Sequence, residues 1–182
     1  TLIYCEGIFV PTEVGGCSWR EQMDIYSRWN LISMAYGVTR FYASWSVFDA
    51  ASYYGAEHYA CAGIMRRIPY CDPKPAYAAY ATMTERLNEA NFDGWLPTGS
   101  LTTYCLRFTG PRGPVYTLWT VRGKRQVTLT LAADAEVGVT DSMNNTKMAK
   151  SAGRKVTITT DQSVTYVTGG EVTAAAVGEP DN

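Results

Sequence analysis

The sequence predicts an α/β unit followed by an all-β unit, and three observations support this prediction. In residues 1–90, short apolar runs alternate with stretches of helical periodicity, which is the pattern of parallel β/α units. Beyond residue 100, apolar residues alternate with polar ones and turn residues separate the runs, as in an antiparallel β-sandwich. The chain has 182 residues, 46% of them hydrophobic, which is enough for a sizeable core.

A short apolar run and a cap predict the first strand and the first helix. Residues 2–5 have the apolar character of a strand that is covered on both faces. Ser18 and Glu21 stand in the spacing of a capping box, so we expect a helix to begin at Trp19. Apolar residues then recur at helical spacing, and Gly37 is placed to end that helix.

A long connection separates the second expected strand from the second expected helix. The strand covers residues 38–45, and two prolines introduce an alanine-rich helix over residues 76–90. The connection at residues 46–72 has no regular pattern, and connections of about 27 residues are usually functional. Two β/α units cannot close a sheet or cover both of its faces, so something else has to supply the remainder.

The second half predicts about six short antiparallel strands, separated by turns rich in Gly, Pro, Asn and Asp. Their alternating residues lie in six segments: 104–108, 115–121, 127–131, 137–139, 156–158 and 164–166. The predicted organisation is therefore an α/β part at residues 1–94 and a β-sandwich at residues 95–170. Residues 171–182 are small and polar, which predicts a flexible tail.

Composition excludes several classes of protein. The net charge is −1 and 18% of residues are charged, which argues against a nucleic-acid-binding protein. No run of about 18 apolar residues exists, so we expect no membrane span. The five cysteines contain no CxxC pair and the chain has one histidine, so neither a metal site nor a cofactor is expected. Most cysteines are expected to be reduced and packed. Cys61 and Cys71 could pair within one loop, but their spacing alone does not show it.

Glu6 and Trp45 are the strongest candidate site residues because each ends an expected strand. In a β/α barrel, side chains at the carboxyl ends of the strands face the active site. Glu6 is therefore a candidate catalytic carboxylate, with an ion pair to an arginine as the alternative. Trp45 is placed to stack on a sugar ring, with a role in the core as the alternative.

Four further candidates lie in the long connection and would contact a substrate: Asp49, Tyr54, Glu57 and His58. His58 is able to bond a hydroxyl or to tune a carboxylate, and a purely structural histidine is the alternative. Glu57 is a substrate contact or an ion-pair partner of Arg66 or Arg67. A thiol or redox protein, with Cys5 as the reactive residue, is a further alternative that rests on the cysteine count.

The order of these segments resembles the end of a clan A glycoside hydrolase barrel. The resemblance is carried by Ile3-Tyr4-Cys5-Glu6-Gly7, by Phe41-Tyr42-Ala43-Ser44-Trp45 and by the stretch PKPAYAAYATMTERL, which is similar to the last barrel helix. The later stretches YCLRF, GPVYTLWT and GKRQVTLTL resemble the small β-sandwich packed on such barrels. The resemblance covers roughly residues 1–168 and implies the last two β/α units of a (β/α)8 barrel followed by that sandwich.

The resemblance also implies roles for two residues. Glu6 would be the nucleophile of a retaining β-glycosidase at the end of strand seven, and Trp45 would line the subsite of the scissile sugar. A retaining mechanism needs a second carboxylate about 5 Å away as acid/base. In this clan it follows an Asn at the end of strand four, and no suitable Asn-Glu pair occurs in this sequence.

The chain alone is therefore expected to be inactive on its carbohydrate substrate. We expect it to be a fragment, or one chain of a two-chain protein, completed by an N-terminal chain or segment. Enzymes of this type are commonly secreted, which favours an extracellular location. The alternative function is a non-catalytic carbohydrate-binding or structural module derived from such an enzyme.

Overall fold

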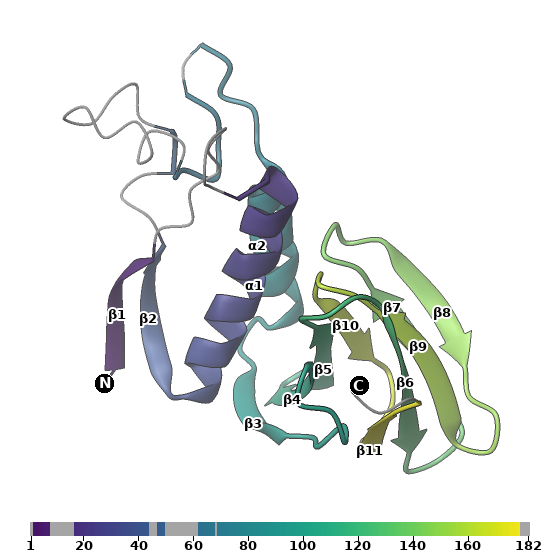
Figure 1. The fold of residues 1–182 in the computed structure, drawn as a ribbon. Helices are drawn as coiled ribbons and strands as arrows, with labels where there is room; N and C mark the ends of the chain where they lie inside the picture. Colours follow the sequence, from purple (N-terminus) through teal and green to yellow (C-terminus); the bar gives the residue numbers. More distant parts are fainter. Residues whose placement is uncertain (1, 8–16, 44–46, 50–61, 68, 179–182) are drawn as a thin grey trace. The chain divides into compact units, whose positions relative to one another are not determined.

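The computed structural model describes residues 2–7, 17–43, 47–49, 62–67 and 69–178. The chain divides into two compact units, Thr1–Ala81 and Thr82–Asn182 (Figure 1). Within the described residues the structure is mostly β, with two helices. Neither helix is long and apolar enough to cross a membrane.

The first unit contains a parallel pair of strands joined through a helix. β1 (Leu2–Gly7) is followed by α1 (Trp19–Ala35), β2 (Val38–Ala43) and the start of α2 (Pro75–Arg86). β1 and β2 pair in parallel. This confirms the predicted order of strand, helix, strand and helix, although α2 ends four residues before the expected position.

The capping box predicted from Ser18 and Glu21 sets the start of α1. The Ser18 hydroxyl accepts a hydrogen bond from the Glu21 backbone N–H at 3.2 Å, and the Glu21 carboxylate accepts one from the Ser18 N–H at 2.7 Å. These bonds lower the pKa of Glu21. Gly37, with φ of 81°, follows the helix end, where a side chain would be strained. Met23 and Tyr26 of α1 pack against two alanines of α2 in the core of this unit.

The second unit contains two antiparallel sheets. The six-stranded sheet has the order β3-β4-β5-β10-β7-β8, and the three-stranded sheet has the order β11-β6-β9. The bounds of the strands are β3 Asn91–Trp95, β4 Thr103–Gly110, β5 Gly113–Thr120, β6 Arg125–Leu131, β7 Glu136–Thr140, β8 Thr146–Lys150, β9 Lys155–Thr160, β10 Thr165–Thr168 and β11 Val172–Val177.

Side chains from both sheets form one hydrophobic core. Its fully buried members include Tyr116 and Leu118 from β5 and Leu129 from β6. The Tyr116 hydroxyl joins the two sheets, because it accepts a hydrogen bond from the Val172 N–H at 2.9 Å and donates one to the Val172 carbonyl at 3.4 Å. Burial raises the pKa of Tyr116. Phe108 and Trp119, on the opposite face of the six-stranded sheet, are also fully buried.

Two predictions about the second unit are wrong. Residues 171–182 were expected to form a flexible tail, yet β11 lies there and pairs antiparallel with β6. The reason is that Val172 and Ala175 enter the core, so even this small, polar segment buries apolar surface. The predicted boundary between residues 94 and 95 falls inside β3, which pairs with β4 and so belongs to the second unit.

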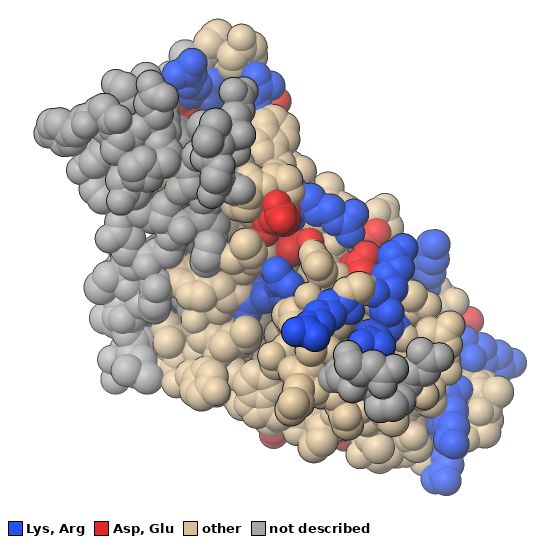
Figure 2. Space-filling model, in the orientation of Figure 1, with Lys and Arg blue, Asp and Glu red and all other residues tan. Residues whose placement is uncertain are grey.

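Exposed lysines mark an edge of each sheet in this unit. Lys147 and Lys150 lie on β8, the last strand of the six-stranded sheet, and Lys155 lies on β9, at an edge of the three-stranded sheet. Figure 2 shows Lys and Arg side chains over this part of the second unit. Lysine on an edge strand opposes pairing with another chain.

Two buried tyrosines on neighbouring strands give a matched test of the link between the sheets. Tyr116→Phe leaves the Val172 backbone without its partner in the core and is expected to lower the free energy of unfolding by about 1–3 kcal/mol. Tyr166→Phe removes a hydroxyl that is buried without a hydrogen-bond partner among the described residues, so the loss should be below about 0.5 kcal/mol. Urea denaturation measures both, and equal losses would contradict the assigned role of Tyr116.

Candidate functional site

The carboxyl ends of β1 and β2 lie side by side and form the candidate site. In the parallel register Tyr4 is opposite Phe41 and Gly7 is opposite Ala43, so both strands end at the same edge. Glu6 directly precedes Gly7 and therefore lies in the last part of β1. Side chains at this edge are the ones that β/α folds use for binding and catalysis.

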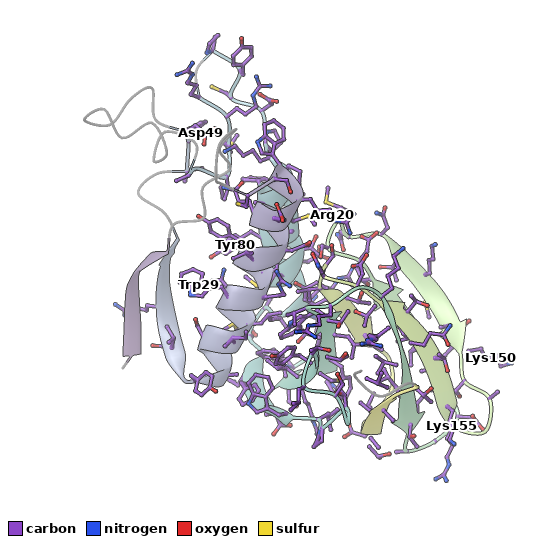
Figure 3. The ribbon with its side chains drawn as sticks, viewed as in Figure 1. Arg20, Trp29, Asp49, Tyr80, Lys150 and Lys155 are labelled. Atoms are coloured by element: carbon purple, nitrogen blue, oxygen red, sulfur yellow. The ribbon has the colours of Figure 1, made fainter. Side chains whose placement is uncertain are left out.

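The other candidate residues differ in whether the structure describes them. Trp45 follows the end of β2 by two residues in the sequence, but it lies outside the described residues, as do Tyr54, Glu57 and His58. The backbone of Glu6 is described, whereas its side chain is not. Asp49 is described fully, on the connection that follows β2 (Figure 3).

Asp49 forms a buried ion pair with Lys74. The Lys74 ammonium lies 2.6 Å from Asp49 Oδ1, and the two side chains are 1% and 11% exposed. The same ammonium donates a hydrogen bond to the Gly63 carbonyl at 2.8 Å. Two oxygens therefore replace part of the hydration that a buried ammonium loses, which makes its burial tolerable.

The backbone around this ion pair is closely packed. The Asp49 N–H donates to the Met65 carbonyl at 2.8 Å, and the Ile64 N–H donates to the Val47 carbonyl at 3.0 Å. Gly63 lies so close to residues 48 and 49 that a Cβ there would be 2.5 Å from the Phe48 carbonyl carbon. Glycine is therefore required at this position by the close approach of two backbones.

Lys74 is the residue of this region that the sequence analysis missed. A lysine between Pro73 and Pro75 gives no periodic signal, and lysines are almost never fully buried unless they are paired. The flanking prolines restrict the backbone at the start of α2, but they do not set the direction of the lysine side chain between them. Asp49 was identified, but its partner was not.

Metal and thiol chemistry receive no support from the described residues. Among them, no group of three or more His, Cys, Asp or Glu side chains is placed to hold a metal ion. Cys17, Cys71 and Cys105 are free thiols. Burial raises the pKa of Cys17 and raises that of Cys105 to about 12. A thiol with a raised pKa is a poor nucleophile. The side chain of Cys5 lies outside the described part of the chain, so the thiol hypothesis based on it stays a prediction.

Comparisons with known proteins find a similar fold but no similar sequence. No family model matches this chain, and no curated protein matches it. A family 39 glycoside hydrolase from the gut symbiont Bacteroides cellulosilyticus WH2 superposes with a TM-score of 0.69 and 17% identity, over 85% of this chain. A family 30 endoxylanase from Clostridium papyrosolvens C71 (TM-score 0.60, 14% identity) covers 93% of it. A family 30 subfamily 8 xylanase from Clostridium acetobutylicum (TM-score 0.59, 11% identity) covers 92%.

The matched region is a minor part of each of these proteins. This chain covers 31% of the family 39 structure and 42% of each family 30 structure. At such low identities the likeness concerns the fold. The chain thus has the fold of a part of these glycoside hydrolases.

The described thiols give a direct test of their assigned burial and exposure. At pH 8, a pKa of about 12 leaves Cys105 with a thiolate fraction about 10³-fold below that of an unperturbed thiol, so it should resist alkylation until the protein unfolds. Exposed Cys71 should react readily in the folded protein. Mass spectrometry after pulsed alkylation measures both, and fast labelling of Cys105 in the folded chain would contradict its assigned burial.

Proposed function

We propose that this chain is the C-terminal part of a retaining β-glycoside hydrolase of clan A, with Glu6 as the nucleophile. The observation that carries the proposal is the position of Glu6 at the carboxyl end of β1, beside the end of the parallel strand β2. The fold adds support, since glycoside hydrolases of families 39 and 30 share it over 85–93% of this chain. In this proposal β1 and β2 are strands seven and eight of a (β/α)8 barrel, and the two sheets of the second unit form the appended β-sandwich.

The proposed reaction needs two carboxylates with different tasks. The Glu6 carboxylate attacks the anomeric carbon and forms a glycosyl-enzyme, while the acid/base protonates the leaving oxygen. The acid/base then takes a proton from water, which attacks the anomeric carbon and releases Glu6. We infer that an N-terminal part or partner chain supplies this second carboxylate. The mechanism requires neither a metal nor a cofactor.

The substrate contacts proposed for this chain follow β2. Trp45 would stack on the sugar ring, and Tyr54, Glu57 and His58 would bond its hydroxyls. Asp49 stays in this proposed set. Its Oδ1 already accepts a hydrogen bond from the Lys74 ammonium, so the carboxylate has less capacity to accept hydrogen bonds from a sugar. The substrate would be a β-linked carbohydrate, and the enzyme would be secreted.

Glu6→Gln provides the first test, made in the complete protein that contains all β/α units. Turnover of aryl β-glycosides should fall by about 10³-fold or more, which corresponds to about 4 kcal/mol of transition-state stabilisation. Glu136→Gln makes the same chemical change at an exposed position on β7 and should leave kcat/KM unchanged. Near-normal turnover of Glu6→Gln would overturn the nucleophile assignment.

A covalent trap sharpens that test. A 2-deoxy-2-fluoro aryl glycoside with a good leaving group should form a glycosyl-enzyme that hydrolyses slowly. Peptide mapping of the trapped wild-type protein should place the added sugar on Glu6, and the Glu6→Gln variant should carry none. A sugar attached to another residue would show that this chain contributes a different function.

A second candidate function, a non-catalytic carbohydrate-binding module, rests on Trp95. Its side chain is 42% exposed at the edge of the six-stranded sheet. Its ring contacts Phe92 edge-on, with centroids 5.9 Å apart, and Tyr104 at 6.4 Å. Tyr104 in turn stacks on the buried Trp119 at 5.2 Å. An exposed tryptophan held by aromatic neighbours is a rigid surface for stacking.

This second candidate predicts that the chain alone binds glycans. Affinity electrophoresis in xylan-containing gels should then show retardation that Trp95→Ala removes, while Met148→Ala, at an exposed apolar side chain on β8, should leave it intact. Absence of retardation would count against the binding module and leave the enzymatic proposal in place.

A further inference from the structure

Two segments that are separated in the sequence lie together in the first unit and form what we call the loop stem, residues 47–49 and 62–65. The stem is closed by backbone hydrogen bonds, from the Asp49 N–H to the Met65 carbonyl at 2.8 Å and from the Met65 N–H to the Val47 carbonyl at 2.9 Å. Gly63 and Asp49, one on each side of the stem, therefore lie close together.

Lys74 connects the two sides of this stem. Its ammonium bonds Asp49 Oδ1 on one side at 2.6 Å and the Gly63 carbonyl on the other at 2.8 Å. Its own backbone N–H donates to the Ile64 carbonyl at 3.0 Å, which fixes the start of α2 against the stem. Gln22 of α1, fully buried, adds long contacts from its amide to the Ala62 and Gly63 carbonyls at 3.5 and 3.4 Å.

A cation is suited to this position in a way that an apolar side chain is not. The Gly63 carbonyl and the Asp49 carboxylate are both acceptors, and bringing them together in a buried place requires a donor between them. The Lys74 side chain is 1% exposed, so its bonds compete little with water and are strengthened by the low local dielectric. Removing the ammonium would leave the nearly buried carboxylate uncompensated.

We propose that Lys74 is a positioning residue, which fixes the two sides of the loop stem relative to each other and holds the Asp49 carboxylate in place. The inference rests on the proposed function, because Asp49 is one of its substrate contacts. Lys74 touches no reacting atom in this proposal. It acts through the stem, and its loss should weaken substrate binding more than the chemical step.

Hydrogen–deuterium exchange on the chain itself tests the positioning role without any substrate. In Lys74→Met, the stem amides of Asp49, Ile64 and Met65 should exchange about 10-fold faster or more, while those within α1 keep wild-type rates. Asp49→Asn, which keeps the shape of the side chain, should give a smaller rise at the same amides. Lys150→Met removes an exposed cation from β8, in the second unit, and should change none of the stem amides.

The pattern of exchange distinguishes positioning from a general contribution to stability. If Lys74 merely stabilised the whole unit, its loss would speed exchange in α1 and in the stem alike, and that result would overturn the proposal. Should Lys74→Met fail to fold, Asp49→Asn decides the question by the same comparison. Wild-type rates at the stem amides in both variants would also overturn it.

Kinetics in the complete protein test the consequence for substrate binding. With 4-nitrophenyl β-xyloside or β-glucoside, whichever the wild-type protein hydrolyses, Lys74→Met should raise KM by about 10-fold and change kcat by less than about 2-fold. An unchanged KM, together with inactive Glu6→Gln, would overturn the positioning role and leave the proposed function intact. If Glu6→Gln stays active, the proposed function fails, and the exchange experiment still decides the role of Lys74.

Discussion

Burial of parallel strands is the constraint on which the rest of the first unit depends. A parallel pair joined through a helix carries apolar side chains on both faces, and such strands are stable only when both faces are covered. In the described residues, β1 and β2 form a two-stranded sheet with α1 as the connection. Two helices cover only part of such a sheet. Burial of the remaining apolar surface therefore favours additional β/α units beside these strands. That requirement supports the proposed barrel independently of any likeness to solved structures.

The same pair of strands sets the position of the candidate site. The parallel register sets where both strands end, and Glu6 lies in β1 between the paired residues Tyr4 and Gly7, where the register shifts. The connection after β2 lacks such regular pairing, and its geometry depends on a few particular contacts. Gly63 permits two backbones to approach closely, and the Lys74–Asp49 pair keeps them together. Sites built on rigid elements are more precise than those built on loops, and a buried ion pair gives a loop some of that rigidity.

The sequence predicted the regular parts of the fold because their signals are local. The capping box of Ser18 and Glu21 and the alternating residues of β4, β5, β6, β7, β9 and β10 all appear in the structure. The strands that were missed are β3, β8 and β11, each at an edge of its sheet. These three strands carry Gly, Lys or Ala at positions where an apolar residue would mark the alternation, so their pattern is weak, whereas β9, also an edge strand, alternates clearly. Lys74 was missed for another reason, since its role arises from a partner 25 residues away in the sequence. Glu6 could be singled out because a charge at the end of an apolar strand is visible without any knowledge of contacts.

In the proposed enzyme, the nucleophile and the acid/base come from different strands, and each has different structural requirements. A nucleophilic carboxylate at a strand end needs little from its own chain beyond a fixed backbone, which β1 and β2 provide. Protonation of the leaving oxygen needs a second carboxyl group held about 5 Å from the first, and general acid catalysis is worth about 10²- to 10⁴-fold in rate. That second group has to come from another strand of the same barrel edge, because only parallel strands bring their carboxyl ends together. In the proposed enzyme, the nucleophile and the acid/base are therefore coupled through the closure of the proposed barrel. A chain that holds one of them gains catalytic power only when the remaining strands bring the other.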